Sequence, residues 1–73
     1  MTTVFEATTR GKKHRVLVTR NEDVYRVERF TSGSSCGVST GHTKESVKAY
    51  LAQMLHYALL WDGINYKVVR DDL

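Results

Sequence analysis

Apolar residues recur at helical spacing through the second half of the chain, between Thr43 and Asp62. Their i, i+3, i+4, i+7 spacing is typical of the buried stripe of an amphipathic helix. Thr43 is a suitable N-cap, and Gly63 supplies a left-handed stop. We therefore expect one helix over about residues 43–62. The stripe consists of Val47, Tyr50, Leu51, Met54, Leu55 and Ala58, widened by Tyr57 and Trp61.

The opposite side of this helix is small, apolar and nearly uncharged, where a solvated helix would place charged residues. Glu45 and Lys48 supply its only charges, both near the start of the helix. An apolar helical face of this kind is typical of a contact surface for another macromolecule. The same face could instead close a twofold homodimer. The residues that we expect to contact a partner are Ala49, Ala52, Gln53, His56, Leu59 and Leu60.

Alternating patterns predict three strands in the first half of the chain, over about residues 3–9, 14–20 and 24–30. Turns at Gly11-Lys12 and Asn21-Glu22 connect them as an antiparallel meander. The expected cross-strand pairs are Phe5 with Val18, Ala7 with Val16, Val18 with Tyr25, and Val16 with Val27. These six residues form one apolar face, which we expect to be the core side of the sheet. A one-residue shift in strand register would expose all six to water, so the register is strongly specified. The residues that we expect to be most deeply buried are Phe5, Val18, Tyr50, Leu51, Met54 and Trp61.

The segment 31–42 is rich in Gly and Ser and is expected to be a long flexible loop, which could include a short edge strand at 37–40. A last strand is expected at about residues 64–70, with Ile64, Tyr66 and Val68 facing inward. Because a helix connects the third strand to this one, we expect it to run parallel to the third or first strand. The fold class is therefore α+β, with a three-stranded antiparallel meander, one long helix packed across it and a fourth C-terminal strand. The whole chain 1–73 forms a single domain.

The net charge is +3, and the basic residues concentrate at the expected tip of the first hairpin. Such a tip could contact a nucleic-acid backbone, and nucleic-acid binding is the alternative function. No exposed aromatic residue is expected beside it, so a stacking platform is missing. The residues in this cluster are Arg10, Lys12, Lys13, His14 and Arg15.

The signals for catalysis are weak, and we expect no enzymatic activity and no cofactor. Two overlapping G-x-S-x-G matches span residues 33–41, as a Gly/Ser-rich tract produces by chance. Cys36 could be a reactive thiol with His42 or His56 as its base. The three His residues and the Cys lack the paired spacing of a metal site. A lone Cys fits a reducing, cytoplasmic setting, and we expect no export signal and no membrane span.

In size, single-domain organisation and absence of a catalytic signature, the chain resembles the small accessory or inhibitor proteins that phages and mobile elements encode. The resemblance extends to anti-CRISPR and polymerase-inhibitor types, and it implies an inhibitor that acts by binding a host protein. The function that the sequence predicts is therefore that of a non-enzymatic binding module acting through protein–protein contact.

Overall fold

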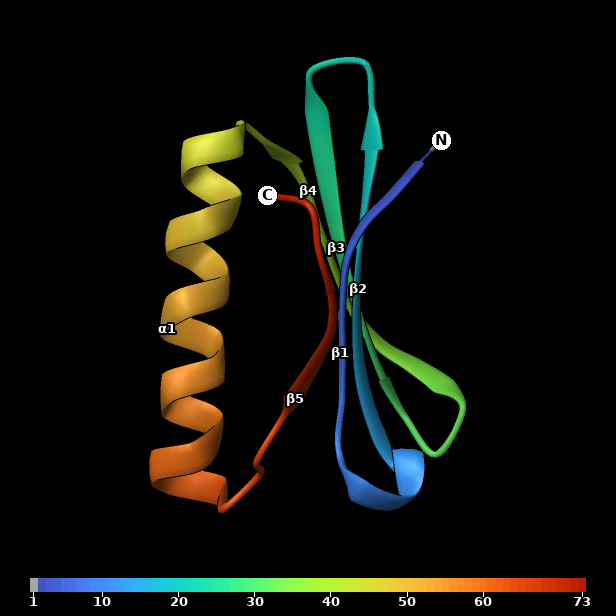
Figure 1. The fold of residues 1–73 in the computed structure, drawn as a ribbon, viewed down its shortest axis with the longest axis vertical. Helices are drawn as coiled ribbons and strands as arrows, with labels where there is room; N and C mark the ends of the chain where they lie inside the picture. The colour runs from blue at the N-terminus through green and yellow to red at the C-terminus, as the bar shows by residue number, and fades with distance from the viewer. Residues whose placement is uncertain (1) are drawn as a thin grey trace.

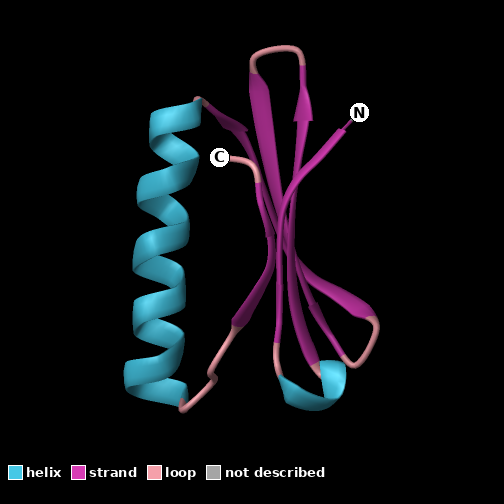
Figure 2. Ribbon diagram, viewed as in Figure 1, coloured by secondary structure: helices cyan, strands magenta, loops and turns pink. Residues whose placement is uncertain are grey.

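One long helix lies across one face of an antiparallel sheet in the computed structural model, which describes residues 2–73 (Figure 1; Figure 2). In this part of the chain the sheet has five strands, in the order β4-β3-β2-β1-β5. Met1, the first residue of the expected domain, lies outside the described residues. The expected α+β class is confirmed, with one more strand than the sequence predicted. The elements are β1 (Thr2–Thr8), a 3₁₀ turn (Arg10–Lys12), β2 (His14–Asn21), β3 (Val24–Thr31), β4 (Ser34–His42), α1 (Lys44–Asp62) and β5 (Lys67–Asp71).

The first hairpin has the predicted register, whereas the register of the second hairpin is shifted by two residues from the prediction. Phe5 pairs with Val18 and Ala7 with Val16, as predicted. The turn between β2 and β3 lies at Glu22-Asp23, one residue later than expected, so Val18 pairs with Val27. Because side chains alternate with period two, a two-residue shift leaves every residue on its predicted face.

The expectation of a loop at 31–42 is wrong, because most of this segment forms β4. Ser32 and Gly33 have φ values of 54° and 82° and connect Thr31 to Ser34 as a two-residue hairpin turn. Positive φ at both central residues is the signature of a type I′ turn, whose twist matches that of the flanking strands. The Gly and Ser content that suggested a loop therefore lies in an edge strand.

The last strand is also shorter and oriented differently from the prediction. It begins at Lys67 and pairs antiparallel with β1 at the other edge of the sheet. The connection through α1 starts from β4, which runs opposite to β3. A parallel return across the sheet therefore makes β5 parallel to β4 and antiparallel to β1.

The ends of α1 follow the predicted signals. The Ser46 backbone N–H donates a hydrogen bond of 3.1 Å to Thr43 Oγ1, which is the N-cap contact. Gly63 has a φ of 66°, and its N–H donates to the Ala58 carbonyl. Glu45 lies in the first turn, where a negative charge complements the helix dipole.

The core lies between the sheet and the N-terminal half of α1. Leu51 is buried as predicted, and Tyr50 and Met54 are half-buried against the core. The predicted burial of Trp61 is wrong, because its side chain is 73% exposed. Figure 1 shows β1–β4 diverging from the C-terminal end of α1, so that only the chain leading into β5 comes near the last turn. The buried residues are Val4, Phe5, Ala7, Val16, Val18, Tyr25, Val27, Val47 and Leu51.

Candidate functional site

All six residues that the sequence predicted to contact a partner lie in water on α1. Ala49, Ala52, Gln53, His56, Leu59 and Leu60 are each exposed. Two further apolar side chains, Tyr57 and Trp61, extend this surface. We call these eight residues the α1 patch. Its role in binding stays a prediction, whereas its exposure is a property of the fold.

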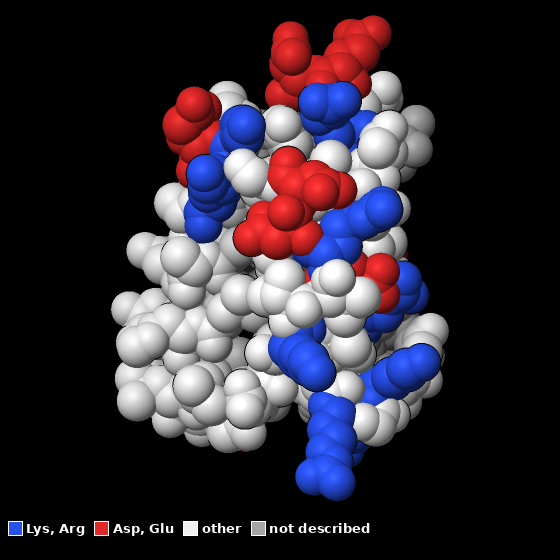
Figure 3. Space-filling view, viewed as in Figure 1, with Lys and Arg blue, Asp and Glu red and all other residues white. Residues whose placement is uncertain are grey.

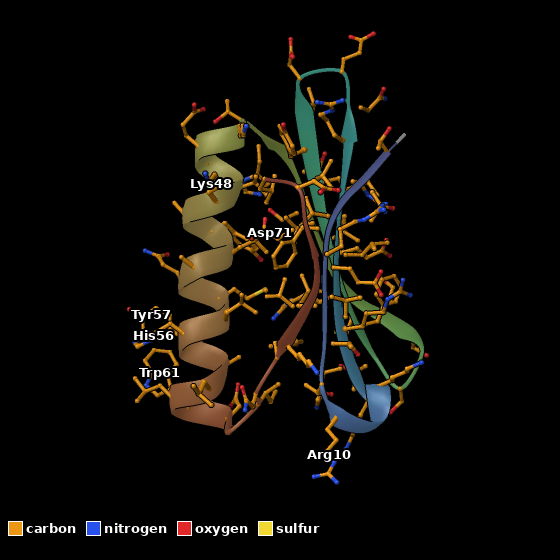
Figure 4. All side chains as sticks on the ribbon, viewed as in Figure 1. Arg10, Lys48, His56, Tyr57, Trp61 and Asp71 are labelled. Carbon is orange, nitrogen blue, oxygen red and sulfur yellow. The ribbon has the colours of Figure 1, made fainter. Side chains whose placement is uncertain are left out.

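An aromatic cluster occupies the C-terminal end of the α1 patch. The rings of Tyr57 and Trp61 stack with centroids 4.5 Å apart and an interplanar angle of 21°. His56 contacts the edge of Tyr57 at 5.4 Å. Figure 4 shows all three side chains on the side of α1 that faces away from the sheet. A stacked pair held by its own helix is a rigid apolar surface, because little side-chain freedom remains to be lost on binding.

Tyr57 and Trp61 were not predicted as surface residues, because their helical angle places them near the buried stripe. Their position in the last two turns before Gly63 was the available signal, since the end of a helix can extend beyond the sheet that covers its middle.

Between Lys48 and Asp62, α1 carries no formal charge. No Lys, Arg, Asp or Glu occurs from Ala49 to Trp61. Figure 3 shows the result as a continuous region of uncharged residues over the lower half of α1, whereas charged side chains cover the upper end of α1 and the sheet. A large, uncharged and apolar surface on a small domain is typical of a protein contact.

The five residues of the basic cluster do not share one surface. Arg10 is exposed, and Figure 4 shows it at the end of the molecule, pointing away from the sheet. His14 is half-buried, with Nδ1 3.4 Å from Thr31 Oγ1. Lys12, Lys13 and Arg15 line a depression of about 480 Å³ on the sheet face that α1 does not cover.

We call this feature the outer depression. Its floor consists of side chains that alternate with the buried ones along the strands, so it lies on the opposite face from the core. Arg15 Nε donates a hydrogen bond of 3.0 Å to Glu6 Oε2, and the Arg15 guanidinium lies over the Phe30 ring at 5.7 Å. The complete lining is Glu6, Thr8, Lys12, Lys13, Arg15, Phe30, Gly33 and Val69.

A half-buried aromatic residue, Phe30, lies beside the basic cluster, where the sequence predicted no exposed aromatic residue. The two-residue shift between β2 and β3 places Phe30 directly opposite Arg15. In the predicted register, Glu28 would have occupied that position. The two-residue error in the predicted register leaves each residue on its predicted face of the sheet. It does, however, assign the wrong cross-strand partner to Arg15 on the outer face.

Charge is also separated along the length of the sheet. The connection between β1 and β2 contains Arg10, Lys12 and Lys13, and the turn between β2 and β3, at the other end of these strands, contains Glu22 and Asp23. Figure 3 shows acidic and basic side chains together over the upper part of the molecule, and basic side chains alone at the lower end of the sheet. The outer depression lies at the basic end.

The candidate catalytic groups do not form a nucleophile–base pair. Cys36 Sγ lies 3.4 Å from Thr31 Oγ1 and 3.5 Å from the Arg29 carbonyl oxygen. Its proposed bases contact other groups, His42 the hydroxyls of two serines and His56 the ring of Tyr57. Both G-x-S-x-G matches lie along the β3–β4 hairpin, where the strand-to-helix turn of a nucleophile elbow does not occur.

His42 instead connects the end of β4 to the first turn of α1. Its Nε2 lies 2.7 Å from Ser39 Oγ, and its Nδ1 lies 3.0 Å from Ser46 Oγ. The imidazole also packs against Tyr50, with ring centroids 5.2 Å apart. A neutral imidazole has one donor and one acceptor, so two hydroxyl partners satisfy both nitrogens. This arrangement fixes the direction in which α1 leaves the sheet.

Tyr66 is half-buried against the core, and the pKa of its phenol is perturbed. Burial raises its pKa above the ordinary value of 10.0. The positive charge of Arg29 opposes this shift, and Cys36 adds to it. Among residues 2–73, no group of three His, Cys, Asp or Glu side chains could hold a metal ion. In the same part of the chain, no helix has the length and apolar character needed to cross a membrane.

Comparisons with protein families, with curated proteins and with solved structures find no match for this chain.

Proposed function

We propose that this chain is a non-enzymatic protein-binding module and that the α1 patch is its contact surface. The observation that supports the proposal most is the exposure of Tyr57, Leu59, Leu60 and Trp61 on a helix segment without charge. These four side chains are 42% to 73% exposed. Covering them with another apolar surface would remove them from water, and the hydrophobic effect favours that transfer.

The size of the patch indicates how strong such a contact would be. Four side chains of roughly 200 Å² each, exposed by about half, present on the order of 400 to 500 Å² of apolar surface. This is the size of the largest apolar patch on a typical monomer, and such patches are often functional. A standard stable interface buries roughly 800 Å² on each partner, so we expect a weak or transient complex.

The occupant that we propose for the α1 patch is a second copy of the chain. Ala49, Gln53, Tyr57 and Trp61 are spaced four residues apart and follow one ridge of the helix. A twofold axis midway between Gln53 and Tyr57 would place Trp61 of each copy over Ala49 of the other. The large ring would then lie against the smallest side chain on the ridge.

Charge also favours this arrangement. A twofold interface places identical surfaces together, so a charged patch would repel itself. The α1 patch has no Lys, Arg, Asp or Glu and is free of that penalty. A nucleic-acid partner would gain little from the same surface, because phosphate binding depends on Lys and Arg.

The test is the solution mass of the wild type and of three single-residue variants, measured by light scattering over a wide range of protein concentration. Leu60→Glu places a charge near the C-terminal end of the α1 patch, where burial of an unpaired carboxylate opposes association. Ala52→Glu places the same charge nearer the N-terminal end of the patch, at a residue that is also exposed. Val38→Glu is the control, because Val38 is a comparably exposed apolar residue on β4, outside the patch.

We expect the wild type and Val38→Glu to approach dimer mass at high concentration, while Leu60→Glu stays a monomer. A wild type that remains monomeric at every concentration would contradict self-pairing. The α1 patch would then be left for a different protein, as in the small phage inhibitors that the chain resembles in organisation, and capture of a partner that Leu60→Glu abolishes would identify it.

A further inference from the structure

The outer depression combines three features that recognition of a nucleotide requires, on the face of the sheet opposite α1. It contains an aromatic ring and a guanidinium that lie together, two further cations at its rim, and a volume of about 480 Å³. Sites for small molecules span roughly 300 to 1,000 Å³. We propose that the outer depression binds one nucleotide unit of a single-stranded nucleic acid, with the base on the Arg15–Phe30 surface and the phosphates on Lys12 and Lys13.

The base-binding surface is held in place before any ligand arrives. Arg15 is fixed from one side by its hydrogen bond to Glu6 and from below by the Phe30 ring. Bases in single-stranded RNA and DNA stack on aromatic rings and on the plane of Arg guanidinium groups. Because Glu6 already accepts from Arg15, its carboxylate is engaged and neutralised beside the site.

The phosphate-binding groups come from the short connection between β1 and β2. Gly11 and Lys12 both have positive φ, at 83° and 59°. A left-handed conformation is unfavourable for Lys, so the fold maintains this bend against a local cost. The bend places Lys12 and Lys13 at the rim of the outer depression, where both are exposed. Neither lysine forms an ion pair within residues 2–73, so both charges are available to phosphate.

The shape of the site favours an unpaired strand over a duplex. The depression lies on an open sheet face, and its aromatic ring is half-buried in the floor rather than on a projecting helix. A base can reach such a ring only when it is not stacked inside a duplex. The base-edge recognition of a duplex instead uses an element that enters a groove.

The experiment is fluorescence polarisation with a labelled oligothymidine of about 12 nucleotides, a length within the range that single domains cover. We expect saturable binding that weakens as salt rises between about 50 and 200 mM. Replacing Lys12 and Lys13 together by Gln should reduce the slope of log affinity against log salt by about 1.4, since each phosphate contact to a single strand contributes roughly 0.7. The control replaces Lys44 and Lys48 by Gln, which changes the net charge equally on α1, away from the depression.

The stacking surface is tested separately from charge. Phe30→Leu keeps an apolar floor but removes the ring, and we expect affinity to fall by about 5- to 150-fold with an unchanged salt slope, as loss of one base stack does. Arg15→Lys keeps the charge and removes the planar group, so it tests the same surface if Phe30→Leu folds poorly. Circular dichroism of each variant checks the fold.

Two further measurements distinguish a free nucleotide, a single strand and a duplex as the ligand: competition against the labelled oligonucleotide, and direct binding of a duplex. Displacement of the oligonucleotide by thymidine monophosphate at comparable concentration would mean that a free nucleotide satisfies the site, and displacement only by longer strands would mean that neighbouring phosphates contribute. Equal binding of a duplex of the same length would overturn the stacking assignment. An absence of binding at low salt, or an equal effect of both lysine pairs, would overturn the site. Neither result bears on the α1 patch, which lies on the other side of the molecule.

Discussion

Replacement of Leu51 by Ala tests the packing of α1 on the sheet. Leu51 is 4% exposed and belongs to the buried cluster together with Val47, one turn earlier. These two are the only buried residues of α1 in the described chain, and Tyr50, Met54 and Leu55 pack against the core beside them. The substitution removes three carbon atoms from that contact and leaves a cavity.

Leu→Ala changes in buried positions destabilise proteins by about 2 to 5 kcal/mol, through lost transfer free energy and the residual cavity. Stability of roughly 0.05 to 0.15 kcal/mol per residue gives this chain about 4 to 11 kcal/mol in total. The expected loss is therefore a large share of the free energy of unfolding. If the stability of the wild type is close to the lower value of this range, a loss of about 5 kcal/mol would unfold the mutant at room temperature.

The assay is urea unfolding followed by far-ultraviolet circular dichroism, because the indole of Trp61 is already exposed in the native state and reports little on unfolding. With a slope near 1 kcal/mol per molar urea for a small domain, we expect the midpoint to fall by about 2 M or more. Leu60→Ala is the control, since it makes the same chemical change at a position that is 61% exposed. Equal midpoints for Leu51→Ala and the wild type would refute the assignment of the buried face.

Two further predictions concern the C-terminal third of the chain. Trp61→Ala should change the free energy of unfolding of the monomer by no more than about 0.5 kcal/mol, because the side chain is exposed, and a loss above 2 kcal/mol in chemical denaturation would place the indole in the core after all. The pKa of Tyr66 is raised in the folded chain, so the unfolded chain loses its phenol proton first as pH rises through 10.0. The free energy of unfolding should therefore be unaffected by Tyr66 below that pH and should fall above it. Tyr66→Phe should weaken this alkaline loss, and unfolding midpoints between about pH 9 and 11 that change equally in both proteins would contradict the assignment.

The faces of the elements could be predicted from the sequence because they depend only on local periodicity. Alternation assigned Val16, Val18 and Val27 to the inside of the sheet, and helical spacing assigned Val47 and Leu51 to the inside of α1. Each assignment needs only the period of the element and the choice of one apolar side. An error of two residues in the second hairpin left these assignments unchanged.

Features that depend on the neighbours of an element could not be predicted in the same way. The strand β4 contains few strand-forming residues, and its pairing with β3 stabilises an extended conformation that its Gly and Ser content does not favour. The exposure of Trp61 depends on where the sheet ends beneath α1, which periodicity along the helix does not contain. The contact of Arg15 with Phe30 depends on the register between β2 and β3. Because the turn between them was placed one residue too early, the outer depression could not be predicted.

The most direct measurement of the central claim, that the α1 patch is a contact surface for a second copy, is the fluorescence of Trp61 as a function of protein concentration. Trp61 is the one tryptophan of the chain and lies within the patch. Burial of its indole between two copies should shift the emission to shorter wavelength as concentration rises, in step with the mass from light scattering. Leu60→Glu should keep the emission of a water-exposed indole throughout, and Val38→Glu should follow the wild type. A wild-type emission that is independent of concentration while the mass doubles would contradict the account, because the copies would then associate through a different surface.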